Sequence, residues 1–330
     1  MTLARRLAPD DQQTDSISSL GVPVVPASRG PVRLALRRLR RDRGAVVGLV
    51  FIAVLAVAAL AAPLVAPYSP VQPHYQNALH GPSTRFLLGT DGLGRDQLSR
   101  ILFGARISLL VVLIAAVAIT VIGVTVGLVS GFYGGLVDVL IQRMIEVFLA
   151  FPPLVLALAI AGALGPGMKS VLIAVISVHW VSYARLVRGT VLSSRQQPYV
   201  EAARALGSSG PWMMFREILP NVLPPVIVLA TLEMGGLLLT ISSLSFLGLG
   251  AQPPTPEWGT MLDQARPYFQ SHPILMIVPG LAITLAVLAF NLVGDGLRDA
   301  LDPRTTRLLV AAKRGPLPGR IVSRRRRVSP

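Results

Sequence analysis

The sequence predicts an all-α membrane protein with six transmembrane helices, and three observations lead to this fold class. The chain has 330 residues, of which 52% are hydrophobic and only 14% are charged. Its mean hydropathy is positive, which is typical of a chain solvated mainly by lipid. Six apolar runs reach the ~20 residues that a helix needs to cross ~30 Å of hydrocarbon. Because these runs are continuous rather than alternating, they indicate helices and exclude a membrane β-barrel.

The six predicted spans follow one another along most of the chain. In order, they cover residues 45–67, 107–132, 147–165, 170–190, 222–248 and 273–294. The first is expected to be retained as an anchor, because its apolar core is longer than the ~7 to 15 residues of a signal peptide. The ends of the third, fourth and fifth spans are less defined, because Glu146, Arg185 and Arg188 lie near boundaries where long charged side chains reach the interface.

Basic residues concentrate in the two tails of the chain. Of its 31 lysines and arginines, nine precede Gly44 and ten follow Gly294. Such tails beside membrane helices are typical of the cytoplasmic side, where they also meet anionic lipid headgroups. No aromatic residues interleave with the C-terminal arginines, which argues against nucleic-acid binding. Both termini are therefore expected in the cytoplasm, as an even number of spans allows.

This topology divides the chain into four parts. Residues 1–43 are a cytoplasmic basic tail, with an interfacial basic helix over 31–43, and residues 44–106 hold the first span and an outer loop. Residues 107–303 form the core domain with the other five spans. The basic C-terminal tail, residues 304–330, is expected to be disordered.

Residues 201–220, called the elbow below, interrupt the apolar sequence between the fourth and fifth spans with EAARALGSSGPWMMFREILP. The topology places this segment in the cytoplasm. Strong helix formers begin it, and Gly207 is expected to end the first helix in a left-handed conformation. Pro211 suits the first turn of a second helix. The spacing of that helix predicts one apolar face, made of Trp212, Phe215 and Leu219.

The elbow resembles the EAA loop of ABC importer permeases, by which the membrane subunit docks onto its ATPase. It has Glu-Ala-Ala, three residues, a glycine, eleven residues and Leu-Pro, although Glu217 stands where the family often has an apolar residue. An ordinary interfacial loop is the alternative interpretation. The resemblance implies that the elbow docks onto an ATPase through Glu201, Ala202, Ala203, Gly207, Leu219 and Pro220.

Three further segments, residues 87–109, 245–269 and 290–304, are similar to the C-type permease subunit of the dipeptide, oligopeptide and nickel group. The resemblance implies a MetI-like fold in a prokaryotic cell membrane, and a permease that forms half of an ATP-driven import pathway for short peptides. It also implies a second permease subunit, giving a heterodimer, two ABC ATPase subunits and an extracytoplasmic substrate-binding protein. The same machinery importing nickel or another small solute is an alternative. A proton-driven secondary transporter is another, although it would need an inverted repeat and paired ionisable groups.

The chain itself is not expected to hydrolyse ATP or to hold a cofactor. Its nearest approach to a phosphate loop is GALGPGMKS at residues 162–170, where the lysine is one residue late and no strand precedes. ATP and Mg²⁺ are therefore assigned to partner ATPase chains, and no catalytic residue is expected here. The chain has no cysteine, and His74, His80 and His272 lack the spacing of a metal site.

Polar and small residues inside the spans are the remaining candidates. Gly123, Gly127 and Gly131 form a stripe that permits close helix packing, either within the chain or against the second permease. Glu233 lies within the fifth span and either lines the translocation route or is neutral and hydrogen-bonded. The family more often has a glutamate around Ile241. His179 is interpreted as a structural hydrogen-bonding residue rather than a proton or metal site.

The outer loop also contains a charged cluster, made of Asp91, Arg95, Asp96 and Arg100. Its alternating signs suggest an outer helix laced by ion pairs. Such a helix would lie where the binding protein lands, or would simply be a solvated face.

Overall fold

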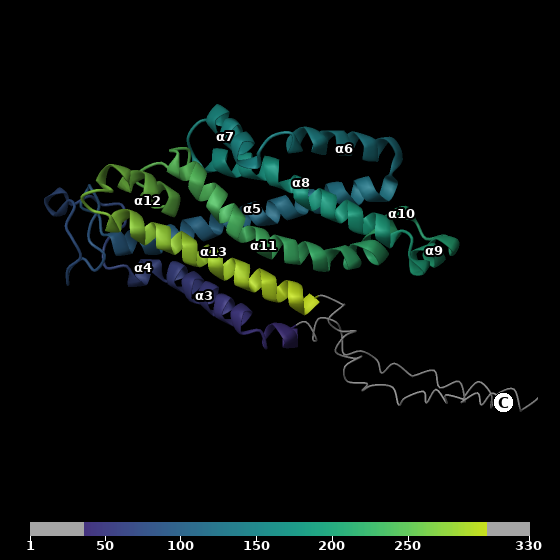
Figure 1. Cartoon of the computed structure of the whole chain (residues 1–330), viewed down its shortest axis with the longest axis horizontal. Coiled ribbons are helices and arrows are strands. Elements are labelled where there is room, and N and C mark those ends of the chain that lie inside the picture. The colour runs from purple at the N-terminus through teal and green to yellow at the C-terminus, as the bar shows by residue number, and fades with distance from the viewer. Residues whose placement is uncertain (1–35, 302–330) are drawn as a thin grey trace, which may run out of the picture.

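The computed structural model describes residues 36–301, and within these residues it is helical without any strand. Five helical runs are each long and apolar enough to cross a membrane, and they lie lengthwise in one bundle (Figure 1). They are α3 (Arg43–Leu60), α5 (Gln97–Tyr133), α8 (Met168–Ser194), the run Gly210–Phe246 that contains α11 (Leu219–Phe246), and α13 (Ile274–Leu301). The all-α class and five of the six predicted spans are therefore confirmed.

The third predicted span, residues 147–165, is not one straight helix. Two helices, α6 (Gly135–Leu149) and α7 (Pro153–Leu164), cover it, and they are bent by 88°. Consecutive prolines at 152 and 153 cause the break, because proline lacks an N–H and disfavours helix in the residue before it. With 12 residues, α7 is ~18 Å long, too short to cross the hydrocarbon alone. The pair makes a sixth span only if both halves are counted together.

The N-terminal end of the first span is set by a cap. The side chain of Asp42 accepts a hydrogen bond from the Ala45 N–H at 3.0 Å, so α3 begins at Arg43. After a break at Ala61 the short α4 (Ala62–Val65) follows. The predicted basic helix over 31–43 is helical at 36–39 but turns at 40–41. Its first residues, the preceding part of the N-terminal tail and the predicted C-terminal tail over 304–330 lie outside the described residues.

The long helices α5 and α8 pack closely along a seam of glycines. A Cβ added at Gly127 would lie 2.6 Å from Val187 Cβ, and one at Gly131 would lie 2.8 Å from Val191 Cβ. A Cβ at Gly123 would collide with Tyr183. All three glycines are buried, and the stripe faces α8 of the same chain.

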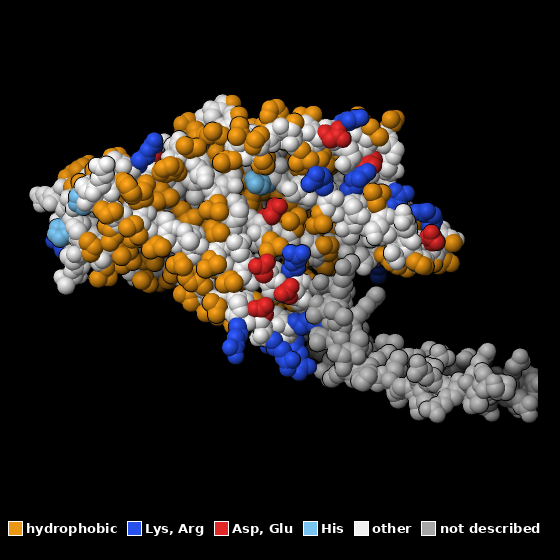
Figure 2. Space-filling model, in the orientation of Figure 1, with side chains coloured by type: hydrophobic (Ala, Val, Ile, Leu, Met, Phe, Trp, Pro, Cys, Tyr) orange, Lys and Arg blue, Asp and Glu red, His pale blue; other side chains and the backbone are white. Residues whose placement is uncertain are grey.

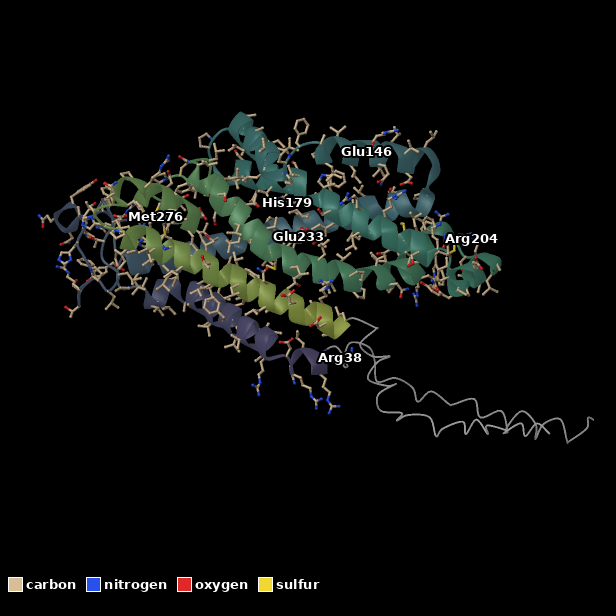
Figure 3. The ribbon with its side chains drawn as sticks, in the orientation of Figure 1. Arg38, Glu146, His179, Arg204, Glu233 and Met276 are labelled. Atoms are coloured by element: carbon tan, nitrogen blue, oxygen red, sulfur yellow. The ribbon has the colours of Figure 1, made fainter. Side chains whose placement is uncertain are left out.

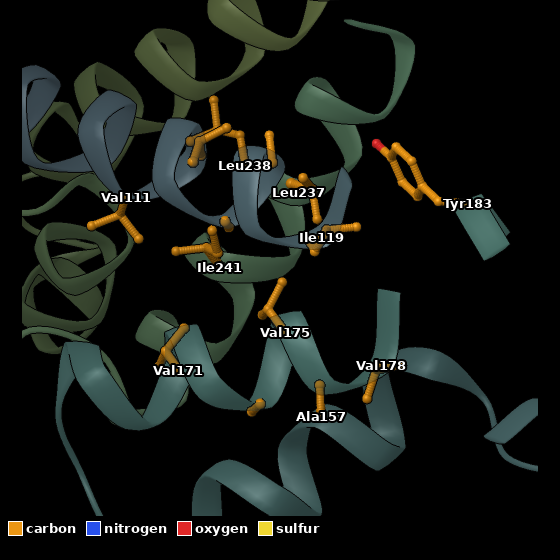
Figure 4. Packing of buried hydrophobic residues seen from close by; sticks show 14 of the residues in the cluster. Val111, Ile119, Ala157, Val171, Val175, Val178, Tyr183, Leu237, Leu238 and Ile241 are labelled. Carbon is orange, nitrogen blue, oxygen red and sulfur yellow. The ribbon is translucent and has the colours of Figure 1, made fainter. Parts of the chain in front are cut away.

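The apolar core lies where α5, α8 and α11 meet (Figure 4). Ile119 from α5, Val175 from α8 and both Leu237 and Leu238 from α11 are almost fully buried there. Ile241 belongs to the same core at 0% exposure, so an apolar side chain fills this position. The core fixes the three helices relative to one another over the middle of the bundle.

The two ends of the bundle carry different structures. At one end, called the loop end below, the loop over residues 66–96 and α12 (Trp258–Ala265) cover the helices (Figure 1). At the opposite end the elbow projects beyond the bundle. Figure 2 shows hydrophobic side chains over much of the visible face, with most of its lysines and arginines toward the elbow end and the start of α3.

Candidate functional site

The elbow is a helix, a tight turn and a second helix that runs on into α11. After α8 ends at Ser194, α9 (Pro198–Ala205) begins with a proline, which is favourable at the first helical position. The second helix starts with α10 (Gly210–Trp212), continues as the π-helix η2 (Met213–Ile218) and joins α11 directly. Any displacement of the elbow is therefore transmitted to α11 without an intervening flexible loop.

Gly207 closes the first elbow helix in the left-handed region, as predicted, with φ +81°. Its N–H donates to the Arg204 carbonyl at 3.0 Å, and the Ser208 N–H donates to the Ala203 carbonyl at 3.1 Å. These two bonds make a Schellman motif, which satisfies the last carbonyls of α9 and reverses the chain. Nothing lies within 4 Å of a Cβ placed at Gly207. Glycine is needed there for its backbone conformation and not for space.

The predicted docking residues differ in exposure. Glu201, Ala202 and Pro220 are exposed, Leu219 is half-buried and Ala203 is buried. Beside them, apolar side chains also point outward: Leu206 is 87% exposed and Phe215 is 60% exposed. The outer surface of the elbow thus combines one carboxylate with uncovered apolar groups.

The sequence did not identify which face of the second elbow helix packs inward. Met213, Met214 and Ile218 are buried, whereas Trp212 and Phe215 of the predicted apolar face are exposed. Residues 213–218 wind as a π-helix, so an α-helical spacing misassigns the inward positions. The predicted face is an outward-facing apolar surface.

Hydrogen bonds hold the elbow as one piece. The Asn221 side-chain amide donates to the Glu217 carbonyl at 2.7 Å and to the Tyr199 hydroxyl at 3.1 Å, which joins the start of α11 to α9. Within residues 36–301, neither Glu201 nor Arg204 forms an ion pair. The charges of the first elbow helix therefore remain available to another chain.

A polar network next to the elbow ties its supporting helices together, and no sequence pattern predicted it. Arg188 of α8 donates to both carboxylate oxygens of Asp138 on α6, at 2.6 and 2.7 Å. Ser130 of α5 donates to the same carboxylate at 2.5 Å. Arg195 also donates to the Gly131 carbonyl at 3.0 Å. Because the bidentate pair joins residues 50 positions apart in sequence, spacing alone does not predict it.

Buried polar atoms occur midway along the bundle, on α8 and α11. Glu233 Oε2 and the Tyr183 hydroxyl are buried and interact with one another, whereas His179 Nε2 is buried without a hydrogen-bond partner within the described residues. Figure 3 labels His179 and Glu233, both near the middle of the molecule. His179 was expected to form a structural hydrogen bond, and its Nε2 forms none within the described residues. A carboxylate inside a membrane helix normally faces a cavity or a partner, so Glu233 remains the pathway candidate.

The charged cluster of the loop end is buried, so neither an outer ion-paired helix nor a solvated face describes it. Asp91 and Arg95 lie in a tight turn just before α5. This turn is held by Asp91 Oδ1, which accepts from the N–H groups of Leu93 and Arg95, both at 2.9 Å. Asp96 caps α5 by accepting from the Ser99 N–H at 2.8 Å. Arg100 is only 1% exposed. The cluster is therefore part of the buried interior at the loop end of the bundle.

Two family models match the chain. One is described as a binding-protein-dependent transport system inner membrane component and matches residues 123–307. The other is described as the N-terminal TM domain of oligopeptide transport permease C and matches residues 30–82. The first covers the elbow, the glycine seam and Glu233.

Relatives of known name resemble the chain over most of its length. The dipeptide transport system permease protein DppC of Alkalihalophilus pseudofirmus is 44% identical, covering 83% of this chain and 90% of the relative. The di/tripeptide transport system permease protein DppC of Pseudomonas aeruginosa is 45% identical, covering 83% and 92%. The glutathione transport system permease protein GsiD of Pectobacterium atrosepticum is 44% identical, covering 84% and 92%.

A solved structure shares the fold. The MetNI methionine ABC transporter, in inward-facing conformations, aligns with a TM-score of 0.50 and 17% sequence identity, covering 62% of this chain and 97% of that one. The two family models match residues 30–82 and 123–307, which include the first span and the helices from the last part of α5 to α13. The chain therefore belongs to the inner membrane permease components of binding-protein-dependent ABC importers, as a C-type subunit.

Proposed function

We propose that this permease imports short peptides. The observation that carries the proposal is its 44 to 45% identity to permeases named for dipeptides, for di- and tripeptides and for glutathione, itself a tripeptide. Family membership removes the proton-driven secondary transporter from consideration. Nickel or another small solute is the competing cargo, and a direct uptake measurement separates the two.

The elbow is the proposed contact with the ATPase. Glu201, Ala202 and Pro220 are exposed, and the nearby Leu206 and Phe215 present apolar surface that this chain leaves uncovered. An ATPase groove would bury those apolar groups and pair the carboxylate. The other three predicted residues would act indirectly. Ala203 and Leu219 pack against the rest of the chain, and Gly207 turns the chain between the two elbow helices. ATP and Mg²⁺ would be bound by the ATPase subunits, with no cofactor on this chain.

The coupling follows from how the elbow is attached. When ATP draws two ATPase subunits together, a docked elbow moves with them, and α11 moves because it continues the second elbow helix. The bidentate Arg188–Asp138 pair and the Arg195 bond to α5 would make α5, α6 and α8 follow. The pathway would then alternate between outward and inward opening.

The remaining partners and the orientation complete the proposal. A second permease subunit would form the other half of the pathway. The elbow and both termini would face the cytoplasm of a prokaryotic cell, and the loop end would receive the extracytoplasmic substrate-binding protein. The concentration of lysines and arginines toward the elbow end supports this orientation (Figure 2).

Glu233 is proposed to line the pathway, where it would meet the ammonium group of a peptide. Its carboxylate is largely buried with only the Tyr183 hydroxyl beside it, and a cation would balance its charge. Uptake of labelled dialanine into proteoliposomes that contain the full complex tests the cargo and this residue together. Wild-type complex should import dialanine only with ATP and the binding protein. Glu233→Gln should lower uptake of dialanine several-fold more than uptake of its N-acetylated form.

Two results would contradict these assignments. Import of Ni²⁺ without any peptide import would identify the other cargo. Equal effects of Glu233→Gln on both peptides would give this residue a structural role.

A further inference from the structure

A cavity of about 240 Å³ lies at the loop end, far from the elbow. It is lined by the loop before α5, the first turn of α5, the helix α12, the short η3 (Arg266–Tyr268) and the beginning of α13. Met261, Tyr268 and Leu275 contribute apolar wall. The polar groups come from Asp91, Arg95, Gln97, Arg100 and Gln264. A mainly apolar pocket with a few convergent polar groups is the usual form of a small-molecule site.

The polar wall carries more positive than negative charge. Arg95 Nε donates to Asp91 Oδ2 at 2.7 Å, and Arg100 Nε lies 3.5 Å from the same oxygen. Two guanidinium groups thus share one carboxylate, and both arginines are at least 97% buried. Asp96 is nearby in sequence but does not line the cavity, and its Oδ2 caps α5. A buried unbalanced charge is costly unless a counterion compensates it.

Gln264 leaves one donor unsatisfied at the same place. Its Oε1 accepts from Arg95 Nη2 at 3.0 Å and from Arg100 Nη2 at 2.8 Å. This fixes the orientation of the amide, because a guanidinium offers only donors. The Nε2 group is then buried, and it has no acceptor within the described residues. At this place in the wall, Asp91 alone faces two guanidinium groups, and Gln264 Nε2 has no acceptor.

We propose that this cavity binds the free carboxylate of a peptide as it enters the pathway. A carboxylate is a monoanion, so it matches the single excess positive charge, and its two oxygens can accept from Gln264 Nε2 and from a guanidinium. Dipeptides, tripeptides and glutathione, the cargoes in the names of the relatives, all carry such a group. The choice of this ligand rests on the peptide import proposed above.

The variant Gln264→Glu tests the site while keeping a side chain of nearly the same size and shape in the cavity wall. A glutamate keeps an acceptor for both arginines, supplies the missing charge and removes the unsatisfied donor. The probe is dialanine, titrated calorimetrically into the complete importer complex in lipid nanodiscs without ATP. Wild-type complex should bind dialanine and not its C-terminal amide. Gln264→Glu should weaken dialanine binding by about 10- to 100-fold, because a charge-assisted contact is lost.

The control is Gln270→Glu, the same chemical change at an exposed position outside the cavity. It should bind dialanine as wild type does, and Gln264→Glu should unfold at or above the wild-type temperature. Unchanged dialanine binding by Gln264→Glu, or equal binding of the amide, would overturn the site. Unchanged dialanine binding with weaker docking of the substrate-binding protein would also overturn it, and would assign the cavity to an acidic side chain of that partner.

Failure of the peptide cargo is distinguishable from failure of the site. If acetate binds to wild type and not to Gln264→Glu, the carboxylate site is supported even where the complex imports no peptide. The proposed cargo would then be wrong and the cavity would still bind a carboxylate.

Discussion

The loop end and the elbow end of the bundle differ in how their polar groups are satisfied. At the loop end, Asp91 serves two arginines and two backbone N–H groups, and Glu257 is fully buried and caps α12. At the elbow end, Glu201 and Arg204 are exposed and form no ion pair within residues 36–301. The carboxylates of Asp91 and Glu257 are thus used within the chain at the loop end, although Asp96 Oδ1 and Gln264 Nε2 are buried there without a partner among the described residues.

This difference separates residues that stabilise the fold from residues that contact another chain. Side chains at the loop end hold the fold together, so their loss should be seen as unfolding. Exposed side chains on the elbow make no comparable contacts within the chain, so their loss should be seen in coupling. Stability and transport measured on the same variants test this separation.

The largest effect is expected from Asp91→Ala. This change removes the carboxylate between two buried arginines, and leaving a buried charge unpaired costs about 3 to 5 kcal/mol. Thermal unfolding in detergent, followed by size-exclusion chromatography, should show a strongly lowered midpoint or no folded protein. The control is Asp263→Ala, whose half-exposed pair with Arg266 is 3.9 Å long and contributes below about 1 kcal/mol. Similar midpoints for both variants would contradict the comparison.

A smaller loss of stability, with a full loss of transport, is expected from Gly207→Val. Valine at φ +81° is strained by about 1 to 3 kcal/mol, enough to misplace the first elbow helix. The complex should assemble and bind its substrate-binding protein, yet neither import peptide nor raise its ATPase activity in response. Gly165→Val is the matched control, because it has φ +85° and equally open space but lies between α7 and α8. Normal import by Gly207→Val would remove the elbow from the mechanism.

The smallest effect is expected from Glu201→Ala. One exposed carboxylate is lost and the turn at Gly207 is intact, so import should fall several-fold without being abolished. The unfolding midpoint should not change. Glu146→Ala removes another exposed carboxylate, paired with Arg143 at 2.8 Å on α6, and should transport normally. If the two variants have equal import rates, Glu201 makes no specific contact.

Much of the fold follows from the sequence because lipid imposes a simple rule. A run of ~20 apolar residues predicts a helix wherever it occurs, and five predicted spans are found as such. The third is bent because Pro152 and Pro153 interrupt it, and hydropathy alone does not register a proline. The left-handed Gly207 was predictable because its turn is local, and few other residues adopt this conformation readily.

The polar contacts of the loop end could not be predicted in the same way. Arg100 is satisfied by Gln264, which lies 164 residues away in sequence. Nothing at either position indicates the other, so spacing suggested an exposed helix instead. The inward face of the second elbow helix was also missed, because a π-helical turn changes the period on which the expectation depended.

The glycine seam has a mechanical consequence. Because the backbones of α5 and α8 touch at three successive turns, the two helices cannot slide or roll past one another without colliding. They should act as a single stiff arm with the length of α5, ~56 Å for its 37 residues. Over that length a tilt of about 5° at one end displaces the other by about 5 Å. A small rotation imposed at the elbow end would thus be amplified into an opening wide enough for a side chain.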